Sequence, residues 1–233
     1  MSLSQTEIVI SARGLHKSFG LTTALHDASC QIERGEIVAI MGPSGSGKST
    51  LLHCLAGIII PDSGEVMYDG KIISTLGEAE RSRLRRTNFG FVFQFGQLLP
   101  ELSALDNVAL PLLLGGHGHT AAYASAKEWL VKVGLSEKLR NTPPELSGGQ
   151  AQRVAIARAM AISPKVLFAD EPTGSLDTVT GERVMELFIS MVRDHGMSLV
   201  IVTHDSRVAA YADREIVMRD GAIVQISESV VSA

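Results

Sequence analysis

One segment of the 233-residue chain reads Gly42-Pro43-Ser44-Gly45-Ser46-Gly47-Lys48-Ser49-Thr50, and it determines the architecture to expect around it. The segment fits the pattern G-x-x-x-x-G-K-[ST], in which glycines let the backbone curl so that several N–H groups point at one phosphate. The apolar run Glu36–Met41 predicts a strand before the loop. A helix is expected to begin at about Gly47 and to bury Leu51, Leu52 and Leu55. A strand, a glycine-rich loop and a helix N-terminus in this order indicate a phosphate-binding site.

The side chains at the end of this loop match the groups that a magnesium nucleotide needs. We expect Lys48 to contact the β- and γ-phosphates and the Ser49 hydroxyl to ligate Mg²⁺. Thr50 is expected near the α- and β-phosphates. The loop alone leaves kinases, GTPases, helicases and transporters open as function classes.

Two adjacent acids follow a second buried strand. Val166–Ala169 predicts the strand, and Asp170 and Glu171 come directly after it. Buried carboxylates are costly without a cation or hydrogen-bond partners, and a magnesium nucleotide supplies the cation. We therefore expect Asp170 to hold Mg²⁺ and Glu171 to be the general base for the attacking water. The alternative is that the two acids cap a following helix.

His204 follows the apolar strand that ends in Val202 and Thr203. In a parallel sheet such a position lies at the same edge as the phosphate loop. We interpret His204 as a polar contact to the γ-phosphate and to the attacking water.

The order of the predicted elements indicates an α/β core with an insertion. Strand signals dominate the early part, including a strand at Ile8–Ile10 and a hairpin turn at Asp69-Gly70, and another hairpin turn is predicted at Asp220-Gly221. From about Glu78 to Arg158 the pattern is mostly helical, with one helix over Ala121–Val133. Strands and helices alternate again afterwards, which favours a mostly parallel sheet. The later elements are the strands at 166–169 and 198–203 and the helix at 181–194.

Charge and hydropathy exclude some classes. The 21 basic and 25 acidic residues give a formal net charge of −4, which argues against nucleic acid held by broad electrostatics. The longest apolar stretches, such as Val108–Leu114, are far shorter than the roughly 20 residues of a membrane helix. Met1–Glu7 has no signal-peptide pattern, so a cytoplasmic location is expected. Cys30 and Cys54 are expected to be free thiols in a reducing compartment, and the stretch from His117 to His119 is expected to be a flexible loop.

A second glycine motif, Leu146-Ser147-Gly148-Gly149-Gln150, precedes another predicted helix. A serine and two glycines before a helix N-terminus form a second anion site. One chain cannot easily bring both sites to one phosphate, whereas two chains arranged head to tail can.

With this motif the chain resembles the ABC ATPase cassettes over nearly its whole length, because Leu146–Gln150 is similar to the family's signature sequence. The other motifs also occur in the family's order, from the phosphate loop through Gln94 and the signature to Asp170-Glu171, Ser175-Leu176-Asp177 and His204. The resemblance implies an α/β P-loop NTPase (RecA-like) core with an inserted helical subdomain and an antiparallel β subdomain near the N-terminus. The chain would be a single ABC ATPase domain, with a core over about 1–90 and 160–233 and the helical part over about 91–159.

The resemblance also implies a homodimer that holds two ATP molecules with Mg²⁺ at its interface. Each ATP would lie between one chain's phosphate loop and the signature residues of the other chain, Ser147, Gly148, Gly149 and Gln150. Asp177 would couple the two sites across the interface. Gln94 would ligate Mg²⁺, sense the attacking water and connect to a membrane subunit. Since Glu171 and His204 are both present, both sites are expected to hydrolyse ATP.

Two positions depart from the family's common pattern. Phe19 stands where a tyrosine usually stacks on adenine, and phenylalanine keeps the aromatic face but lacks the hydroxyl. Ala151 follows the signature where glutamine is common. Both departures are compatible with nucleotide binding.

The segments Gly90–Val108 and Glu171–Asp177 look like one subgroup, which serves lipoprotein release, macrolide and peptide efflux, haem export and cell-division signalling. The resemblance implies a separate membrane permease with few transmembrane helices and an extracytoplasmic domain, export rather than import, and a place at the cytoplasmic face of the membrane. Apolar side chains around Gln94 would line a groove for this partner, or else belong to ordinary core. They are Phe91, Phe93, Phe95, Leu98 and Leu99.

Two other functions remain as alternatives. A regulatory ATPase that activates an extracytoplasmic enzyme would have the same cassette. A soluble ABC ATPase acting on DNA or the ribosome fits less well, since the chain has one cassette and no room for a long coiled coil between Thr50 and Leu146. The cargo stays open among lipid, lipoprotein, peptide, drug and haem.

Overall fold

The computed structural model describes residues 7–94 and 97–228. Residues 1–6 and Phe95, for which the sequence analysis made predictions, therefore lie outside the described residues. The chain forms two compact units. Unit 1 contains the described residues up to Ser82 and those from Gly196 onward, and unit 2 contains those from Arg83 to His195. Helix α2 (Glu78–Asn88) includes the boundary between them.

An antiparallel sheet in unit 1 has the strand order β2-β1-β4-β5. Its strands are β1 (Ile8–Phe19), β2 (Thr22–Glu33), β4 (Ser63–Tyr68) and β5 (Lys71–Ile72). The β4–β5 hairpin turns at Asp69 and Gly70, whose φ angles are 45° and 72°, as the sequence predicts. The long β1–β2 pair was only partly predicted, because register shifts interrupt the alternation of apolar residues along it.

Unit 1 also contains the parallel strands that carry the phosphate loop. Strand β3 (Ile37–Met41) lies between β8 (Ser198–Val202) and β9 (Arg214–Arg219) and is parallel to both. Strand β10 (Ala222–Glu228) pairs antiparallel with β9 through the predicted turn at Asp220 and Gly221. Helix α1 (Lys48–Leu55) packs against β1, β2 and β8, and its residues Leu51, Leu52 and Leu55 are fully buried, as expected. The short helix α7 (Ser206–Ala209) follows β8.

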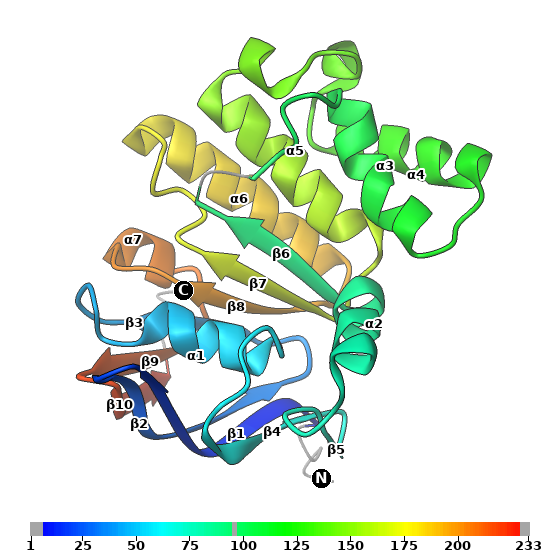
Figure 1. The fold of residues 1–233 in the computed structure, drawn as a ribbon. Coiled ribbons are helices and arrows are strands. Elements are labelled where there is room, and N and C mark those ends of the chain that lie inside the picture. The colour runs from blue at the N-terminus through cyan, green and yellow to red at the C-terminus, as the bar shows by residue number, and fades with distance from the viewer. Residues whose placement is uncertain (1–6, 95–96, 229–233) are drawn as a thin grey trace, which may run out of the picture. The chain divides into compact units, whose positions relative to one another are not determined.

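Unit 2 is mostly helical. Helix α5 (Gly148–Ala161) packs against α3 (Ala104–Leu114), α4 (His119–Lys132) and α6 (Thr178–Asp194), as Figure 1 shows. Two short 3-10 helices, Ser136–Lys138 and Pro143–Glu145, precede α5. Among the described residues, no helix is long and apolar enough to cross a membrane.

Two parallel strands complete unit 2, β6 (Phe89–Phe93) and β7 (Val166–Asp170). Strand β6 falls in the block expected to be mostly helical. Its short FGFVF run has no helical period, and it forms a strand by pairing with β7, where Phe89 packs edge-to-face on Phe168. The expectation of a flexible loop at His117–His119 was wrong for His119, because His119 begins α4 and its ring stacks on Tyr123 at 4.2 Å.

Candidate nucleotide-binding site

The phosphate loop has a backbone that only glycine permits. The φ angles of Gly42, Gly45 and Gly47 are 146°, 79° and 97°, in the region that disfavours other residues. A Cβ on Gly42 would lie 2.3 Å from the carbonyl oxygen of Met218, and one on Gly47 would lie 2.3 Å from that of Ala24. The loop is therefore packed tightly from outside, and its concave side is made of main chain.

Two polar side chains in the loop are buried and poorly satisfied. Ser46 is 3% exposed, and its Oγ has no hydrogen-bond partner among the described residues. Lys48 is 8% exposed, and its Nζ donates to the carbonyl oxygen of Pro43 at 2.8 Å. Buried donors of this kind normally have partners, and an ammonium group has three hydrogens to donate. Phosphate oxygens would accept from both groups, so the loop fits a nucleotide's phosphates.

The start of α1 adds to this cradle. Its N-cap is Gly47, which offers no side chain to the N–H groups of the first turn. The helix dipole favours negative charge at these N–H groups, so the first turn suits an anion. Ser49 is exposed in this first turn, where its hydroxyl is accessible to a metal ion.

Main-chain hydrogen bonds from the turn at Gly221 support the phosphate loop, and the sequence did not predict this brace. The N–H of Gly221 donates to the Ser46 carbonyl oxygen at 3.1 Å, and the Gly221 carbonyl accepts from the N–H of His26 at 2.8 Å. The β9–β10 turn thus joins the loop to β2. The Asp220-Gly221 signal predicted the turn, but only the tertiary structure shows what the turn supports.

Unit 1 brings His204 to the same end of the sheet as the loop. Ile40 pairs with Val202, and the N–H of Thr203 donates to the Ile40 carbonyl oxygen at 3.2 Å. The chain therefore leaves β3 into the loop and β8 into His204 at one edge, and the His204 side chain is exposed. Phe19 ends β1 and is 51% exposed, with the Lys17 ammonium 5.6 Å from the centre of its ring, so the exposed part of the ring is available for stacking.

Unit 2 brings together Gln94, Asp170 and Glu171. Phe93 pairs with Asp170, so Gln94 and Glu171 both follow at the same end of the two strands. The hydroxyl of Ser175 donates to the Gln94 carbonyl oxygen at 2.7 Å. Parallel strands that end in a carboxylate and an amide supply the oxygen ligands that Mg²⁺ prefers.

Glu171 has an unusual backbone. Its φ is 48°, although it is not glycine. Such a conformation costs on the order of 1–3 kcal/mol and occurs preferentially at functional sites. The alternative role as a helix cap does not apply at α6, because Asp177 is its N-cap and accepts from the Thr180 N–H at 3.0 Å. Asp177 accepts hydrogen bonds from both the side chain and the backbone of Thr180. The side-chain bond, followed by the backbone bond, holds the pKa of Asp177 below its usual range.

The signature residues begin α5, as predicted. Ser147 is the N-cap and forms a capping box with Gln150, in which the Ser147 N–H donates to the Gln150 Oε1 at 2.9 Å. A Cβ on Gly149 would lie 2.4 Å from Thr180 Cγ2, and one on Gly148 would lie 3.1 Å from Leu176 Cδ2. The two glycines thus allow close packing against α6 and the turn before it, a role that the motif alone did not reveal.

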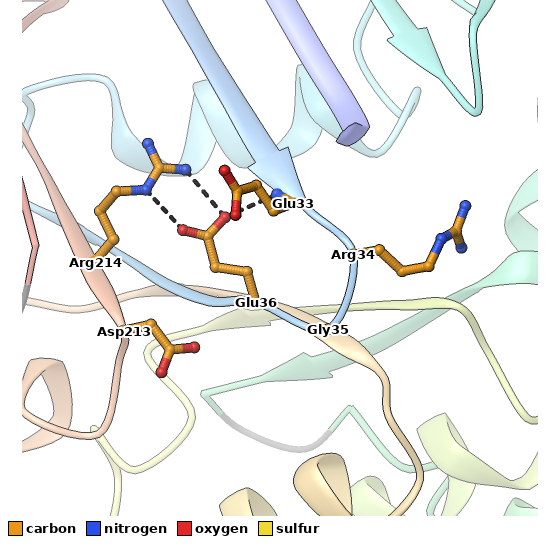
Figure 2. A pocket seen from close by; sticks show the side chains of 6 residues that line it. All are labelled: Glu33, Arg34, Gly35, Glu36, Asp213 and Arg214. Atoms are coloured by element: carbon orange, nitrogen blue, oxygen red, sulfur yellow. Dashed lines mark hydrogen bonds and ion pairs between the residues drawn. The ribbon is translucent and has the colours of Figure 1, made fainter. Parts of the chain in front are cut away.

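A polar cavity of about 330 Å³ lies elsewhere in unit 1. Figure 2 shows its lining, where Arg214 makes a double hydrogen bond to Glu36 at 2.7 and 3.0 Å. Glu36 directly precedes β3, at the end of the strand opposite to the one that enters the phosphate loop. Ligands of such sheets bind at the carboxyl ends of the strands. We therefore assign this cavity to structural ion pairing and not to the nucleotide.

Comparisons with known proteins agree with this geometry. A family model described as "ABC transporter" matches residues 25–174. The lipoprotein-releasing system ATP-binding protein LolD of Shewanella oneidensis is 42% identical, over 96% of this chain and 98% of that protein. LolD of Bacteroides thetaiotaomicron is 46% identical, over 92% of this chain and 99% of that protein.

Solved structures of ABC cassettes are also similar to this chain over nearly its whole length. The dimeric structure of MJ0796, described as a bacterial ABC transporter cassette, has a TM-score of 0.88 and 38% identity, over 96% of this chain and 99% of that one. A dimeric post-hydrolysis state of MJ0796, bound to ADP and Pi, has a TM-score of 0.87 and the same coverage.

Proposed function

This chain belongs to the ABC transporter family as an ATP-binding, ATP-hydrolysing subunit, and on that premise we propose that it drives lipoprotein release through a separate membrane subunit. The expected fold class, an ABC ATPase core with an antiparallel β subdomain, is confirmed by the family match and the cassette structures. The observation that carries the choice of cargo is 42% and 46% identity to two LolD proteins over nearly the whole chain. This identity supports lipoproteins as the proposed cargo over the alternatives.

In this proposal the phosphate loop binds ATP through its main-chain N–H groups and through Lys48. The Lys48 ammonium exchanges its contact with the Pro43 carbonyl for the β- and γ-phosphates. The exposed ring of Phe19 stacks on the adenine. The residues assigned to Mg²⁺ are Ser49, Gln94 and Asp170, all with oxygen ligands, and the ion neutralises charge on the phosphate oxygens.

Three side chains are assigned to hydrolysis: a general base, a group that orients the attacking water and a polar contact to the γ-phosphate. Glu171 takes a proton from the attacking water. Gln94 orients that water, and His204 contacts the γ-phosphate. None of these three side chains is deeply buried, so each is accessible to a ligand.

The proposal includes a head-to-tail homodimer. The N-terminus of α5, with Ser147, Gly148, Gly149 and Gln150, contacts the γ-phosphate of the ATP that a second copy binds. Asp177 lies in an exposed turn and couples the two sites. The dimeric state of the MJ0796 structures supports this arrangement.

The membrane subunit is proposed to bind near Gln94, at the cytoplasmic face of the membrane. Leu99 is 44% exposed and suits such an apolar contact. Phe91 instead stacks on Phe168 at 5.5 Å, which agrees with the alternative that part of this apolar group is ordinary core.

A pull-down from native membranes tests the proposal. The tagged Glu171→Gln chain, held in ATP, is used to capture partners from detergent-solubilised membranes of the source organism, with Lys48→Ala as the control whose nucleotide binding is expected to be weakened. We expect a membrane protein with few transmembrane helices and a large outer domain, together with lipoprotein. A many-helix permease with a solute-binding protein would indicate an importer, and ribosomal or DNA-repair proteins alone would contradict the transport function.

A further inference from the structure

The main chain at Gln94 and on both sides of it accepts hydrogen bonds from side chains that have no role in the proposed chemistry. Three of its carbonyl oxygens each accept a hydrogen bond from a side chain of unit 2. The donors and acceptors are Gln152 Nε2 to Phe93 at 3.0 Å, Ser175 Oγ to Gln94 at 2.7 Å, and Arg158 Nη1 to Gln97 at 2.7 Å. Loop carbonyls usually bind water, so three side-chain donors within five residues form a specific clamp.

The first of these bonds comes from a residue that is almost fully buried. Gln152 lies on α5 and is 2% exposed, so its amide must find partners inside the protein. The Phe93 carbonyl is the last of β6, and it lies directly before Gln94. Gln152 thus fixes the point at which the chain leaves the strand.

The bond from Arg158 fixes the other side of Gln94. Arg158 lies near the end of α5, and burial lowers the pKa of its guanidinium. A hydrogen bond from a charged and partly desolvated donor is stronger than one between neutral groups. Its acceptor, Gln97, has a φ of 44°, a conformation that non-glycine residues rarely adopt and that needs outside support.

The third bond connects the clamp to the loop of the general base. Ser175 lies between Glu171 and Asp177, so its bond to the Gln94 carbonyl joins the two loops directly. The two loops also approach each other closely at Gly174, because a Cβ there would lie 2.8 Å from Gln94 Nε2.

We infer that Gln152, Arg158 and Ser175 are positioning residues that set the orientation of Gln94. Two of them stand on α5, the helix whose first turn is the signature sequence. A displacement of the signature end of α5 is therefore transmitted through hydrogen bonds to Gln94. This inference rests on the proposed function, since it assumes that Gln94 contacts Mg²⁺ and the attacking water.

A double-mutant cycle on ATP hydrolysis by the full chain tests the inference. Arg158→Met keeps the apolar stem and removes the donor, and we expect kcat to fall about tenfold, equivalent to about 1.4 kcal/mol, with little change in KM. Ser175→Ala should act in the same direction. In a Gln94→Ala background, Arg158→Met should cost less than about a further twofold, because residues that act through one another are not additive. Arg158→Lys, which retains a cationic donor, should recover part of the loss.

Arg183→Met is the matched control, since it makes the same change at an exposed position of α6. It should leave kcat unchanged. An equal loss from Arg158→Met in both backgrounds, or equal losses in the two arginine variants, would overturn the inference.

Hydrogen exchange of the peptide spanning residues 89–99 gives a readout that does not depend on activity. Arg158→Met should speed exchange there and Arg183→Met should not, and unchanged exchange in Arg158→Met would contradict the clamp. If the unmodified chain failed to hydrolyse ATP, the proposed function would be wrong, and the exchange result would still decide whether these side chains hold the segment.

Discussion

Lys48 shows why the loop is shaped for a ligand. Lys48 is 8% exposed, and within residues 7–94 and 97–228 its ammonium group donates to the Pro43 carbonyl oxygen. Burial of a cation is costly unless its hydrogens are paired, and a neutral carbonyl compensates less than phosphate oxygens do. Nucleotide binding therefore relieves an unfavourable arrangement that folding creates.

Lys48→Ala should accordingly weaken ATP binding by at least about tenfold, the equivalent of about 1.4 kcal/mol, since a hydrogen bond to a charged group contributes about 1.5–3 kcal/mol. Isothermal titration calorimetry with Mg-ATP measures the change. Lys71→Ala serves as the control, because Lys71 is an exposed lysine of β5 in the same unit. An unchanged Kd in Lys48→Ala would refute the cradle.

Glu171 is the residue whose backbone conformation most directly suggests chemistry, because its φ of 48° is maintained without glycine. Glu171→Gln keeps the shape of the side chain and removes the base. Turnover should fall by about 10²–10⁴-fold, the usual contribution of a general base, while ATP affinity is kept. Phosphate release gives the rate, with Glu186→Gln on the exposed face of α6 as the control. A loss of less than twofold would assign the base elsewhere.

At the scale of the elements, two helices begin with the same kind of N-terminal cap. Both α3 and α5 start with a serine capping box, Ser103 with Asp106 and Ser147 with Gln150. Only the second one has two glycines after the serine. The two helices therefore allow the effect of a cap on stability to be measured separately from the proposed effect of the signature on activity.

Ser147→Arg should abolish hydrolysis and leave ATP binding by one chain largely intact, because it puts bulk and charge where the second copy's phosphate would bind. Ser103→Ala removes an equivalent cap and should cost about 1 kcal/mol of stability without loss of activity. Steady-state ATPase assays, nucleotide titration and urea unfolding compare the variants. Normal turnover in Ser147→Arg would remove the signature from the mechanism.

The sequence predicted those elements whose signal is local. The turns at Asp69-Gly70 and Asp220-Gly221, helix α1 and strand β7 lie where expected, because left-handed turn residues and unbroken apolar runs need no distant partner. Strand β2 was missed, since register shifts and an Asp27 φ of 51° break its alternation. Strand β6 was missed because its pairing with β7, more than 70 residues away in the sequence, makes it a strand.

Site residues were predictable where one motif contains the chemistry. The loop 42–50 and the acids at 170–171 could be predicted as site residues because their residue types and their strand–loop order are typical of a phosphate-binding site, and their roles stay predictions. The clamp on Gln94 and the brace at Gly221 could not be found in this way. Both depend on contacts between residues that are distant in the sequence, and a glutamine or an arginine inside a helix gives no signal of its own.

At the scale of the whole molecule, the two cysteines report on folding. Both are free and buried, and burial raises the pKa of each thiol to about 12. At pH 8 such a thiol is ionised to roughly one part in ten thousand, so reaction with a thiol reagent should be very slow. The labelling rate should rise by at least about a hundredfold in denaturant, because unfolding restores an ordinary thiol pKa. Rapid labelling of the native chain would contradict the burial of Cys30 and Cys54.

The central claim is that two copies close around ATP and that Glu171 ends this state by hydrolysis. The most direct measurement is the mass of Glu171→Gln by light scattering, with and without Mg-ATP. We predict the 24.9 kDa mass of one chain without nucleotide and twice that mass with ATP, while Ser147→Arg in the same background stays at the single-chain mass. A Glu171→Gln chain that remains monomeric in saturating ATP would contradict the account.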